Sequence, residues 1–324
     1  MNHAIQFTHV GNRDVLQWQP LSLPETAPYE VRLRHTAIGV NYIDTYHRSG
    51  LYPLPLPSGL GVEAAGVVEA VGEGVTDLQV GDRVAYAGGT PGAYAEYRTM
   101  PAARLVKLPD DIRDETAAAM MLKGLTAEYL LRRTYTVQPG DTILIHAAAG
   151  GVGLIACQWV KALGATVIGT VSTAAKAELA AQHGCDYPLI VPAEDFVARV
   201  KAITQGRGVP VVYDGVGQST FAGSLDCLTP RGLLVAFGNA SGPIPPIDPL
   251  LLSNKGSLFF TRPTLGHYIA SREELLAASQ ALFDVVRSGA VRIEINQRFA
   301  LADAAAAHQA LEARQTTGST ILLP

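Results

Sequence analysis

Apolar runs of strand length alternate with helical stretches along the middle of the chain. Residues 142–145 form an apolar run, and apolar positions then recur at helical spacing over 154–164. A second apolar run, 165–171, follows at the spacing of a right-handed βαβ crossover. The same alternation predicts helices at 177–183 and 196–204, and strands at 187–191, 209–214 and 232–237. This pattern is typical of a parallel sheet covered by helices on both faces.

The preceding part of the chain, residues 1–120, is rich in short strands. Residues 4–8 and 30–38 alternate apolar with polar positions, as half-buried strands do. Two more short strands are predicted at 65–72 and 80–85, between glycine turns, and the proline-rich segment 52–59 is predicted to be a loop. Many short strands punctuated by glycine suggest a small barrel.

Helical patterns return at the junction of these two parts and near the C-terminus. An acidic start followed by alanines predicts a helix at 114–122, and a second helix is expected at 126–133. The last section predicts, in order, a helix at 273–288, a strand near 291–299, a helix at 302–316 and a strand at 319–323. It has no nucleotide motif, so we expect residues 268–324 to complete a first domain, 1–124, around a nucleotide-binding domain, 125–267.

Composition restricts the class of protein. A chain of 324 residues is long for one core, and 17% charged with 48% apolar residues is typical of a globular protein. Neither an apolar run able to span a bilayer nor a cleavable leader is seen, so a cytoplasmic protein is expected. The net charge of −4 argues against nucleic acid and membrane partners. The three cysteines, Cys157, Cys185 and Cys227, lie too far apart to suggest disulfides or a metal cluster.

The turn after the strand at 142–145 contains only small residues. Gly150, Gly151 and Gly153 follow three alanines, which leaves the backbone amides open to a pyrophosphate at the positive end of the next helix. The usual Gly-x-Gly-x-x-Gly pattern is here Ala147-x-x-Gly150-x-x-Gly153, so this turn alone could simply allow close packing of strand and helix. The second strand at βαβ spacing favours a dinucleotide site.

The end of that second strand indicates which dinucleotide is preferred. It reads Ser172-Thr173-Ala174-Ala175-Lys176, without the acidic residue that would bind the ribose hydroxyls of NAD. Lys176 and the two hydroxyls could hold a 2′-phosphate through charge-assisted hydrogen bonds, which favours NADP(H). In the alternative interpretation, Lys176 is a solvated lysine in the first turn of the next helix.

Seven segments, taken together and in order, resemble a known family. The chain is similar to the zinc-independent medium-chain dehydrogenases/reductases of the quinone oxidoreductase group, which includes the more distant zeta-crystallin. This resemblance implies an α/β fold, with a GroES-like β-barrel catalytic domain, a Rossmann domain with a doubly wound parallel sheet, and a homodimer. The segments are 39–46, 59–66, 80–84, 123–126, 146–153, 212–217 and 237–242.

No zinc site is expected. Alcohol dehydrogenase relatives place a zinc-binding cysteine where this chain appears to have Asn41, and a histidine within the segment 59–66, which has none. They also carry four closely spaced cysteines, whereas this chain has no cysteine before Cys157. Without a Lewis acid, a more easily reduced acceptor than an alcohol or ketone is expected, such as a quinone or an activated double bond.

The resemblance implies direct hydride transfer from NADPH to a quinone, with Asn41, Tyr46 and Tyr52 as catalytic candidates. Tyr46 or Tyr52 could hydrogen-bond a quinone oxygen. Tyr42 and Tyr46 could equally be ordinary interface aromatics, four residues apart on a short helix, and Asp44 could cap a turn or serve the site. The cofactor-binding candidates are Tyr42, Ile43, Tyr46, Lys123, Thr126, Tyr129, Ala149, Gly150, Gly151, Val152, Gly153, Ser172, Thr173, Lys176, Phe237, Gly238, Asn239, Ser241, Arg262 and Arg314. For Arg314, a place on a helix surface is the alternative.

Two other functions stay open at this stage. An NADPH-dependent alkenal or enone reductase would use the same scaffold and differ only in the shape of its acceptor. A protein of another class, an NADPH-binding structural or RNA-binding protein like zeta-crystallin, would keep the cofactor site. The acidic net charge and the absence of a lysine-arginine cluster argue against RNA as the main partner.

Overall fold

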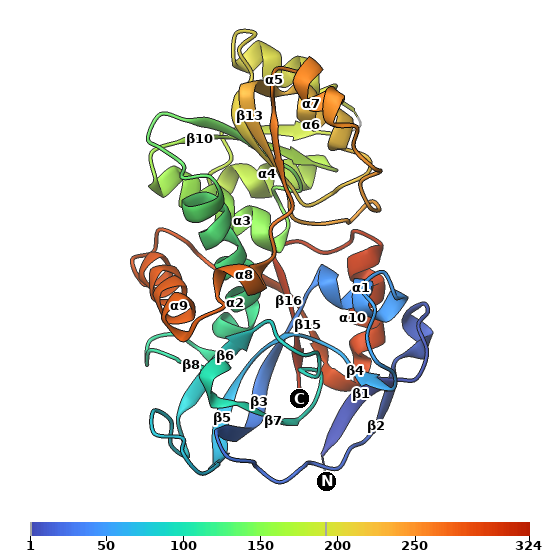
Figure 1. Cartoon of the computed structure of the whole chain (residues 1–324), viewed down its shortest axis with the longest axis vertical. Helices are drawn as coiled ribbons and strands as arrows, with labels where there is room; N and C mark the ends of the chain where they lie inside the picture. Colours follow the sequence, from blue (N-terminus) through green and yellow to red (C-terminus); the bar gives the residue numbers. More distant parts are fainter. Residues whose placement is uncertain (1, 192) are drawn as a thin grey trace. The chain divides into compact units, whose positions relative to one another are not determined.

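The computed structural model of the chain describes residues 2–191 and 193–324. The chain divides into two compact units (Figure 1). Unit 1 comprises the residues up to Leu125 together with Ile269–Phe283 and Ile293–Pro324. Unit 2 comprises Thr126–Tyr268 and Asp284–Arg292.

Unit 2 is built on a six-stranded sheet in which every neighbouring pair is parallel. The strand order is β11-β10-β9-β12-β13-β14, so the chain moves outward first on one side of β9 and then on the other. This is the order of a doubly wound Rossmann sheet, whose ligands bind at the carboxyl ends of the strands. The strands are β9 (Thr142–Ile145), β10 (Thr166–Val171), β11 (Tyr187–Ile190), β12 (Val209–Asp214), β13 (Leu228–Ala236) and β14 (Phe259–Thr261).

Helices cover both faces of this sheet. α3 and α4 contact each other and β10, whereas α5 and α6 contact each other and the strands β11 to β13. Right-handed crossovers place these two pairs on opposite faces, which explains why the strands are largely apolar. Leu144, Ile168 and Val212 are fully buried in the core between strands and helices. The helices of unit 2 are α3 (Gly151–Ala162), α4 (Ala174–Gln182), α5 (Phe196–Ile203), α6 (Phe221–Asp226), α7 (Pro249–Asn254) and α8 (Leu265–Tyr268).

Unit 1 is the β-rich part. Its larger sheet has the order β15-β16-β3-β5-β6-β8, with β7 also paired to β3, and a three-stranded sheet has the order β2-β1-β4. Phe7, Leu33 and Tyr86 belong to one buried apolar cluster shared by strands of both sheets. The α/β fold class predicted from the sequence is therefore confirmed. The strands are β1 (His3–Phe7), β2 (Gln17–Pro20), β3 (Glu30–Val40), β4 (Ser58–Gly59), β5 (Glu63–Val71), β6 (Arg83–Ala87), β7 (Tyr97–Pro101), β8 (Val106–Lys107), β15 (Ile295–Ala300) and β16 (Ser319–Leu323).

The helices of unit 1 lie beside these strands (Figure 1). α1 directly follows β3, and α10 lies between β15 and β16 in the chain. The helices are α1 (Tyr42–Ser49), α9 (Arg272–Arg287), which continues past Phe283 into the residues assigned to unit 2, and α10 (Ala304–Glu312), with short 3₁₀ turns η1 (Arg13–Val15), η2 (Ala102–Arg104) and η4 (Leu301–Asp303).

The prediction of two helices at 114–122 and 126–133 is wrong. The structure has one helix, α2 (Asp114–Tyr129), followed by a π-helical turn, η3 (Leu130–Thr134). A single interior glycine costs a helix only about 1 kcal/mol, so Gly124 does not end it. Gly124 is instead needed for packing, because a Cβ there would lie 2.5 Å from Cδ1 of Leu282 on α9.

Several predicted boundaries also shift. β15 begins at Ile295 rather than near 291, and α10 ends at Glu312 rather than 316. β6 begins only at Arg83, because Gly81 occupies a turn with a φ of +92°. α3 begins at Gly151, within the glycine turn, three residues before the predicted start. This earlier start places the glycines in the first turn of the helix.

Candidate active site

The predicted nucleotide site of unit 2 is assembled at one edge of its sheet. In a parallel sheet the carboxyl ends of all strands meet at the same edge. The candidate residues follow four such ends: the glycine turn follows β9, Ser172 and Thr173 follow β10, Phe237 follows β13, and Arg262 follows β14. The sheet order therefore brings together residues that are far apart in the sequence.

The turn after β9 leads directly into the amino end of α3. Ala147 adopts a φ of +55°, in the left-handed region that few non-glycine residues occupy. Gly150 is the extended N-cap, and no side chain among the described residues caps the helix there. Leu154 N donates to Gly150 O at 2.9 Å, so the amides of the first turn have no acceptor within the helix. Such amides, with the helix dipole, suit an anion.

Glycine is required in this turn for close packing as well. A Cβ at Gly153 would lie 2.4 Å from Ala147 O and 2.7 Å from the Ala148 backbone, which is too close for any side chain. A Cβ at Gly169 on β10 would lie 2.6 Å from the Cβ of Ala148. The two interpretations of the turn are thus compatible, because close packing holds the bare amides at the sheet edge.

The helix that follows β10 begins with a side-chain N-cap. Thr173 is the N-cap of α4, and its Oγ1 accepts a hydrogen bond from Lys176 N at 3.3 Å. Lys176 therefore lies in the first turn of α4, as the alternative interpretation of the sequence expected. Its contact with a 2′-phosphate stays a prediction.

A buried polar network links the strand ends beneath the turn. Asp214, at the end of β12, is fully buried, and its Oδ2 accepts hydrogen bonds from Thr220 at 2.7 Å and Ser224 at 3.1 Å. His146 contacts Ser224 Oγ at 2.9 Å and Thr170 Oγ1 at 2.8 Å. Burial lowers the pKa of His146, so it is a neutral hydrogen-bonding bridge. This network fixes the ends of β9, β10 and β12 relative to one another.

The other cofactor candidates of unit 2 have clear places. Arg262 donates to Ala236 O at 3.0 Å, which joins β14 to the end of β13. The Phe237 ring lies against Gly215, where a Cβ would be 3.0 Å from the ring. Tyr129 stacks on Tyr268 with ring centroids 4.4 Å apart, and burial raises its pKa. The remaining candidates in unit 2 are Thr126 on α2, Ala149 and Val152 beside the glycines, and Gly238, Asn239 and Ser241 after β13.

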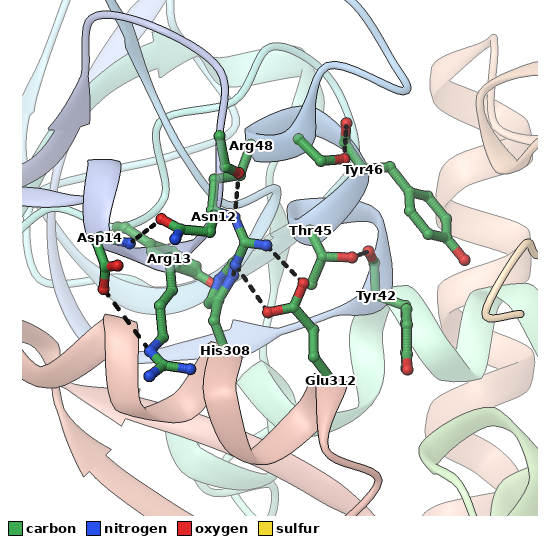
Figure 2. Close-up of polar contacts among 12 residues, drawn as sticks. Asn12, Arg13, Asp14, Tyr42, Thr45, Tyr46, Arg48, His308 and Glu312 are labelled. Carbon is green, nitrogen blue, oxygen red and sulfur yellow. Dashed lines mark hydrogen bonds and ion pairs between the residues drawn. The ribbon is translucent and has the colours of Figure 1, made fainter. Parts of the chain in front are cut away.

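In unit 1, an aromatic cluster is built on α1. The rings of Tyr42 and Tyr46 are tilted with centroids 6.0 Å apart, and Tyr52 meets Tyr46 edge-on at 5.2 Å. Tyr46 is buried, whereas Tyr42 and Tyr52 are partly exposed. Burial raises the pKa of Tyr42, and the nearby charge of Arg314 opposes that rise. Figure 2 shows Tyr42 and Tyr46 on α1. The structure thus groups the predicted tyrosines.

Asn41 and Lys123 converge on a residue that the sequence analysis did not select. Glu63, at the start of β5, is fully buried. Its Oε2 accepts from Asn41 Nδ2 at 2.7 Å and pairs with Lys123 Nζ at 3.1 Å, and its Oε1 accepts from Leu122 N at 2.7 Å. Glu63 therefore turns the Asn41 amide so that its carbonyl oxygen faces away from this contact. The sequence signal was an acidic residue within an apolar segment at the start of a strand.

α1 is anchored to α10 by a charged side chain. Arg48 is 3% exposed, and its guanidinium pairs with Glu312 in a two-point contact at 3.1 and 2.5 Å. The same guanidinium donates to His308 Nδ1 at 3.1 Å, as Figure 2 shows. Burial, with the Arg48 charge, lowers the pKa of His308 to about 3. This contact fixes the helix that carries the tyrosines.

The remaining unit 1 candidates are less enclosed. Ile43 is partly exposed on α1. Arg314 is exposed and follows the end of α10, with a φ of +58°. Its place beyond the helix agrees in part with the alternative of a surface residue.

No helix among the described residues is long and apolar enough to cross a membrane. Within the same residues, no group of three or more histidine, cysteine, aspartate or glutamate side chains is arranged to hold a metal ion.

Comparisons with known proteins identify both units. A family model described as "Alcohol dehydrogenase GroES-like domain" matches residues 27–110, and one described as "Zinc-binding dehydrogenase" matches residues 151–283. A quinone oxidoreductase of Pseudomonas aeruginosa is 58% identical over the full length of both chains. A 2-haloacrylate reductase of a Burkholderia species is 49% identical, over 97% of this chain and 96% of its own.

A solved structure is similar to this chain over nearly its full length. The Escherichia coli quinone oxidoreductase complexed with NADPH has a TM-score of 0.98 and 50% identity, over 99% of this chain and 100% of its own. Sequence and structure thus agree over both units. The chain belongs to the medium-chain dehydrogenase/reductase family, in its quinone oxidoreductase group.

Proposed function

We propose that this protein is an NADPH-dependent quinone oxidoreductase that transfers hydride directly to a quinone without zinc. The observation that carries the proposal is full-length similarity to quinone oxidoreductases, at 58% identity to one and 50% to another solved with NADPH. The side chains fit this chemistry. The uncapped amino end of α3 suits a pyrophosphate, and the tyrosines of α1 can hydrogen-bond a quinone oxygen.

Each unit has a distinct task in this mechanism. NADPH, when bound, supplies a hydride from its nicotinamide ring. The amides of Gly151, Val152 and Gly153 hold the pyrophosphate, and Lys176 holds the 2′-phosphate. In unit 1, Tyr46 and Tyr52 orient the quinone. The other cofactor candidates are proposed contacts along the dinucleotide: Tyr42, Ile43, Lys123, Thr126, Tyr129, Ala149, Gly150, Ser172, Thr173, Phe237, Gly238, Asn239, Ser241, Arg262 and Arg314.

The glutamate contact defines what Asn41 can do in the site. Because its Nδ2 donates to Glu63, Asn41 presents its carbonyl oxygen, which only accepts hydrogen bonds. Asn41 can therefore bind an N–H or O–H group through this oxygen, while one of the two Nδ2 hydrogens is committed to Glu63. We propose that Asn41, held in this orientation by Glu63, positions a ligand.

A second acceptor class is favoured by one comparison. The relative at 49% identity is named a 2-haloacrylate reductase, and a haloacrylate is an activated double bond. Steady-state NADPH oxidation by the purified protein distinguishes quinones from activated alkenes as acceptors. The acceptors to compare in parallel are a benzoquinone, a naphthoquinone, an α,β-unsaturated aldehyde and 2-chloroacrylate. Rapid turnover of quinones supports the proposal, and turnover only of the alkenes replaces it with an enone reductase. No turnover at all would favour a binding protein, which a gel shift with RNA, with and without NADPH, then tests.

The cofactor preference has its own test. We expect Lys176→Ala to raise KM for NADPH about 10- to 100-fold, since a hydrogen bond to a charged group contributes about 1.5–3 kcal/mol. KM for NADH should change little, because NADH has no 2′-phosphate. Lys201→Ala, which removes a lysine from α5, serves as the matched control. Equal effects of Lys176→Ala on both dinucleotides would contradict the assigned role.

We also propose a homodimer that works in the cytoplasm. β14 is an edge strand of the unit 2 sheet, and Phe259 on it and Leu250 on α7 are 61% and 67% exposed. An exposed apolar edge of this kind suits pairing with a second copy across a two-fold axis. Light scattering after size exclusion should show a dimer for the wild type and a monomer for Phe259→Lys. Leu276→Lys, at an exposed position on α9, should stay dimeric.

A further inference from the structure

Two fully buried carboxyl groups lie on either side of Asn41, and their surroundings differ. Glu63 has donors on both oxygens and an ion pair with Lys123. Asp44 accepts on Oδ2 only, from Asn41 N at 2.8 Å and Tyr94 Oη at 2.9 Å. Its Oδ1 is buried and has no hydrogen-bond partner among the described residues. Two such carboxyls in one site are suited to different charge states.

An ionised Asp44 would be costly in this place. A carboxylate is only an acceptor, and an unsatisfied buried acceptor that carries charge is strongly unfavourable. A proton on Oδ1 removes the charge, which is the larger part of this cost. The geometry of Asp44 therefore favours the neutral acid with its proton on Oδ1.

The directions of a buried series of hydrogen bonds, from Arg48 to Asp44, show that the proton of Asp44 is not on Oδ2. A guanidinium can only donate, so His308 Nδ1 accepts from Arg48 and its Nε2 carries the hydrogen. That N–H donates to Tyr94 Oη at 3.1 Å, and the Tyr94 hydroxyl then donates to Asp44 Oδ2. Because every donor of the chain points toward Asp44, Oδ2 remains an acceptor and cannot hold the proton.

We propose that Asp44 holds on Oδ1 the proton that the reduced substrate takes up, and that Arg48, His308 and Tyr94 are positioning residues for it. This inference rests on the proposed function. Burial raises the pKa of Asp44 to about 7. Among the groups that face Asp44, Glu63 also raises this pKa, whereas Lys123 and the bonds from Asn41 and Tyr94 lower it. Asp44 thus exchanges its proton near neutral pH.

The proton step balances with the hydride step. The quinone gains a proton and two electrons as hydride and becomes a hydroquinone anion. The O–H bond at Asp44 Oδ1 breaks, a new O–H bond forms on the anion, and Asp44 becomes a carboxylate. A proton from solvent then restores the neutral acid. The net reaction consumes one hydride and one proton for each quinone.

The first test does not require activity. Infrared spectra of the protein without dinucleotide should show a protonated-carboxyl band that is lost as pH rises through about 7. Asp44→Asn should lack this band, and Asp14→Asn, which changes an exposed aspartate of unit 1, should retain it. Absence of a carboxyl band titrating near neutral pH in the wild type would overturn the proposal.

The second test uses kinetics. Wild-type kcat with a quinone should fall above about pH 7, and Asp44→Asn should lose about 10²-fold or more in kcat together with this pH dependence. Tyr94→Phe removes a donor to the charged form, so both the infrared titration and the pH profile should shift upward. Unchanged kcat and pH profile in Asp44→Asn would refute the proton role. If the wild type reduces no quinone, the proposed function fails, while the infrared titration still decides whether Asp44 holds a proton.

Discussion

Gly153 shows how one missing side chain serves packing and, in the proposed function, cofactor binding. Its Cα lies so close to the backbone of Ala147 and Ala148 that no Cβ fits. The same closeness fixes the amides of the first turn of α3 at the carboxyl edge of the sheet. Its proposed contribution to NADPH binding is therefore tied to the shape of the turn.

We predict that Gly153→Ala lowers stability by about 1–3 kcal/mol, because the backbone must shift to admit the new methyl group. NADPH binding should weaken with it, since the first-turn amides move. Urea unfolding and titration calorimetry measure the two effects. Gly266→Ala is the control, because a Cβ there meets no atom within 4 Å. Tight NADPH binding by a destabilised Gly153→Ala would separate the packing role from the binding role.

Local features of the site could be read from the sequence, whereas its buried contacts could not. The strand, glycine turn and helix are contiguous, so Gly150, Gly151 and Gly153 could be predicted as cofactor contacts from the sequence alone. Glu63 and Asp44 matter because of partners at positions 41, 94 and 123, which only the fold brings near. The sequence gives no sign that both oxygens of Glu63 have hydrogen-bond partners, whereas only one oxygen of Asp44 has them.

At the scale of elements, the junction of α1 and α10 depends on an asymmetric ion pair. Arg48 is 3% exposed, but the side chain of Glu312 is 40% exposed. Loss of the glutamate would leave a cation buried, whereas loss of the arginine would leave an anion that water can still reach. Because Arg48 is buried, the stability of unit 1 depends on the more exposed Glu312.

We predict that Glu312→Ala destabilises unit 1 by about 1.5–3 kcal/mol, the usual cost of losing a hydrogen bond to a charged group. Hydrogen exchange of the α1 amides should also increase, because the helix loses its anchor. Glu115→Ala removes the partner of Arg298 in a pair exposed on both sides and should cost less than about 1 kcal/mol. Equal costs for the two variants would show that burial of Arg48 does not matter.

Element types were predicted well, and element boundaries less so. The Rossmann strands were identified because they are buried on both faces and so are continuously apolar. The break predicted within α2 failed because Gly124 is explained by a contact with Leu282, which lies 158 residues away in the sequence. A glycine that serves tertiary packing looks the same in a sequence as one that ends a helix.

For the whole molecule, buried neutral histidines make the fold sensitive to acid, whereas the raised pKa of Asp44 acts in the opposite direction over the same pH range. Burial lowers the pKa of His308 to about 3 and that of His35 to about 4. Below pH 6.5 the unfolded chain takes up protons on these residues and the folded chain does not. Stability is therefore lost as pH falls from about 6.5 toward these values, by up to about 1.4 kcal/mol per pH unit for each histidine.

We predict that His308→Gln makes the urea midpoint less sensitive to pH between about 6.5 and 4 than in the wild type. Glutamine can accept from Arg48 and donate to Tyr94 without titrating, so the network is preserved. His9→Gln, at an exposed position, should leave the slope unchanged. An unchanged slope in His308→Gln would mean that the histidine is protonated in the folded protein.

The closing strand of unit 1 has a consequence for how the protein is made. β16 inserts between β15 and β3, and Thr320 pairs with Val40. All of residues 126–268 must therefore leave the ribosome before the sheet of unit 1 can be completed. Unit 2 has its whole sheet within 142–261 and can fold during synthesis. Until β16 is made, the carboxyl end of β3 keeps an unpaired edge, and such an edge is a template for association with another chain.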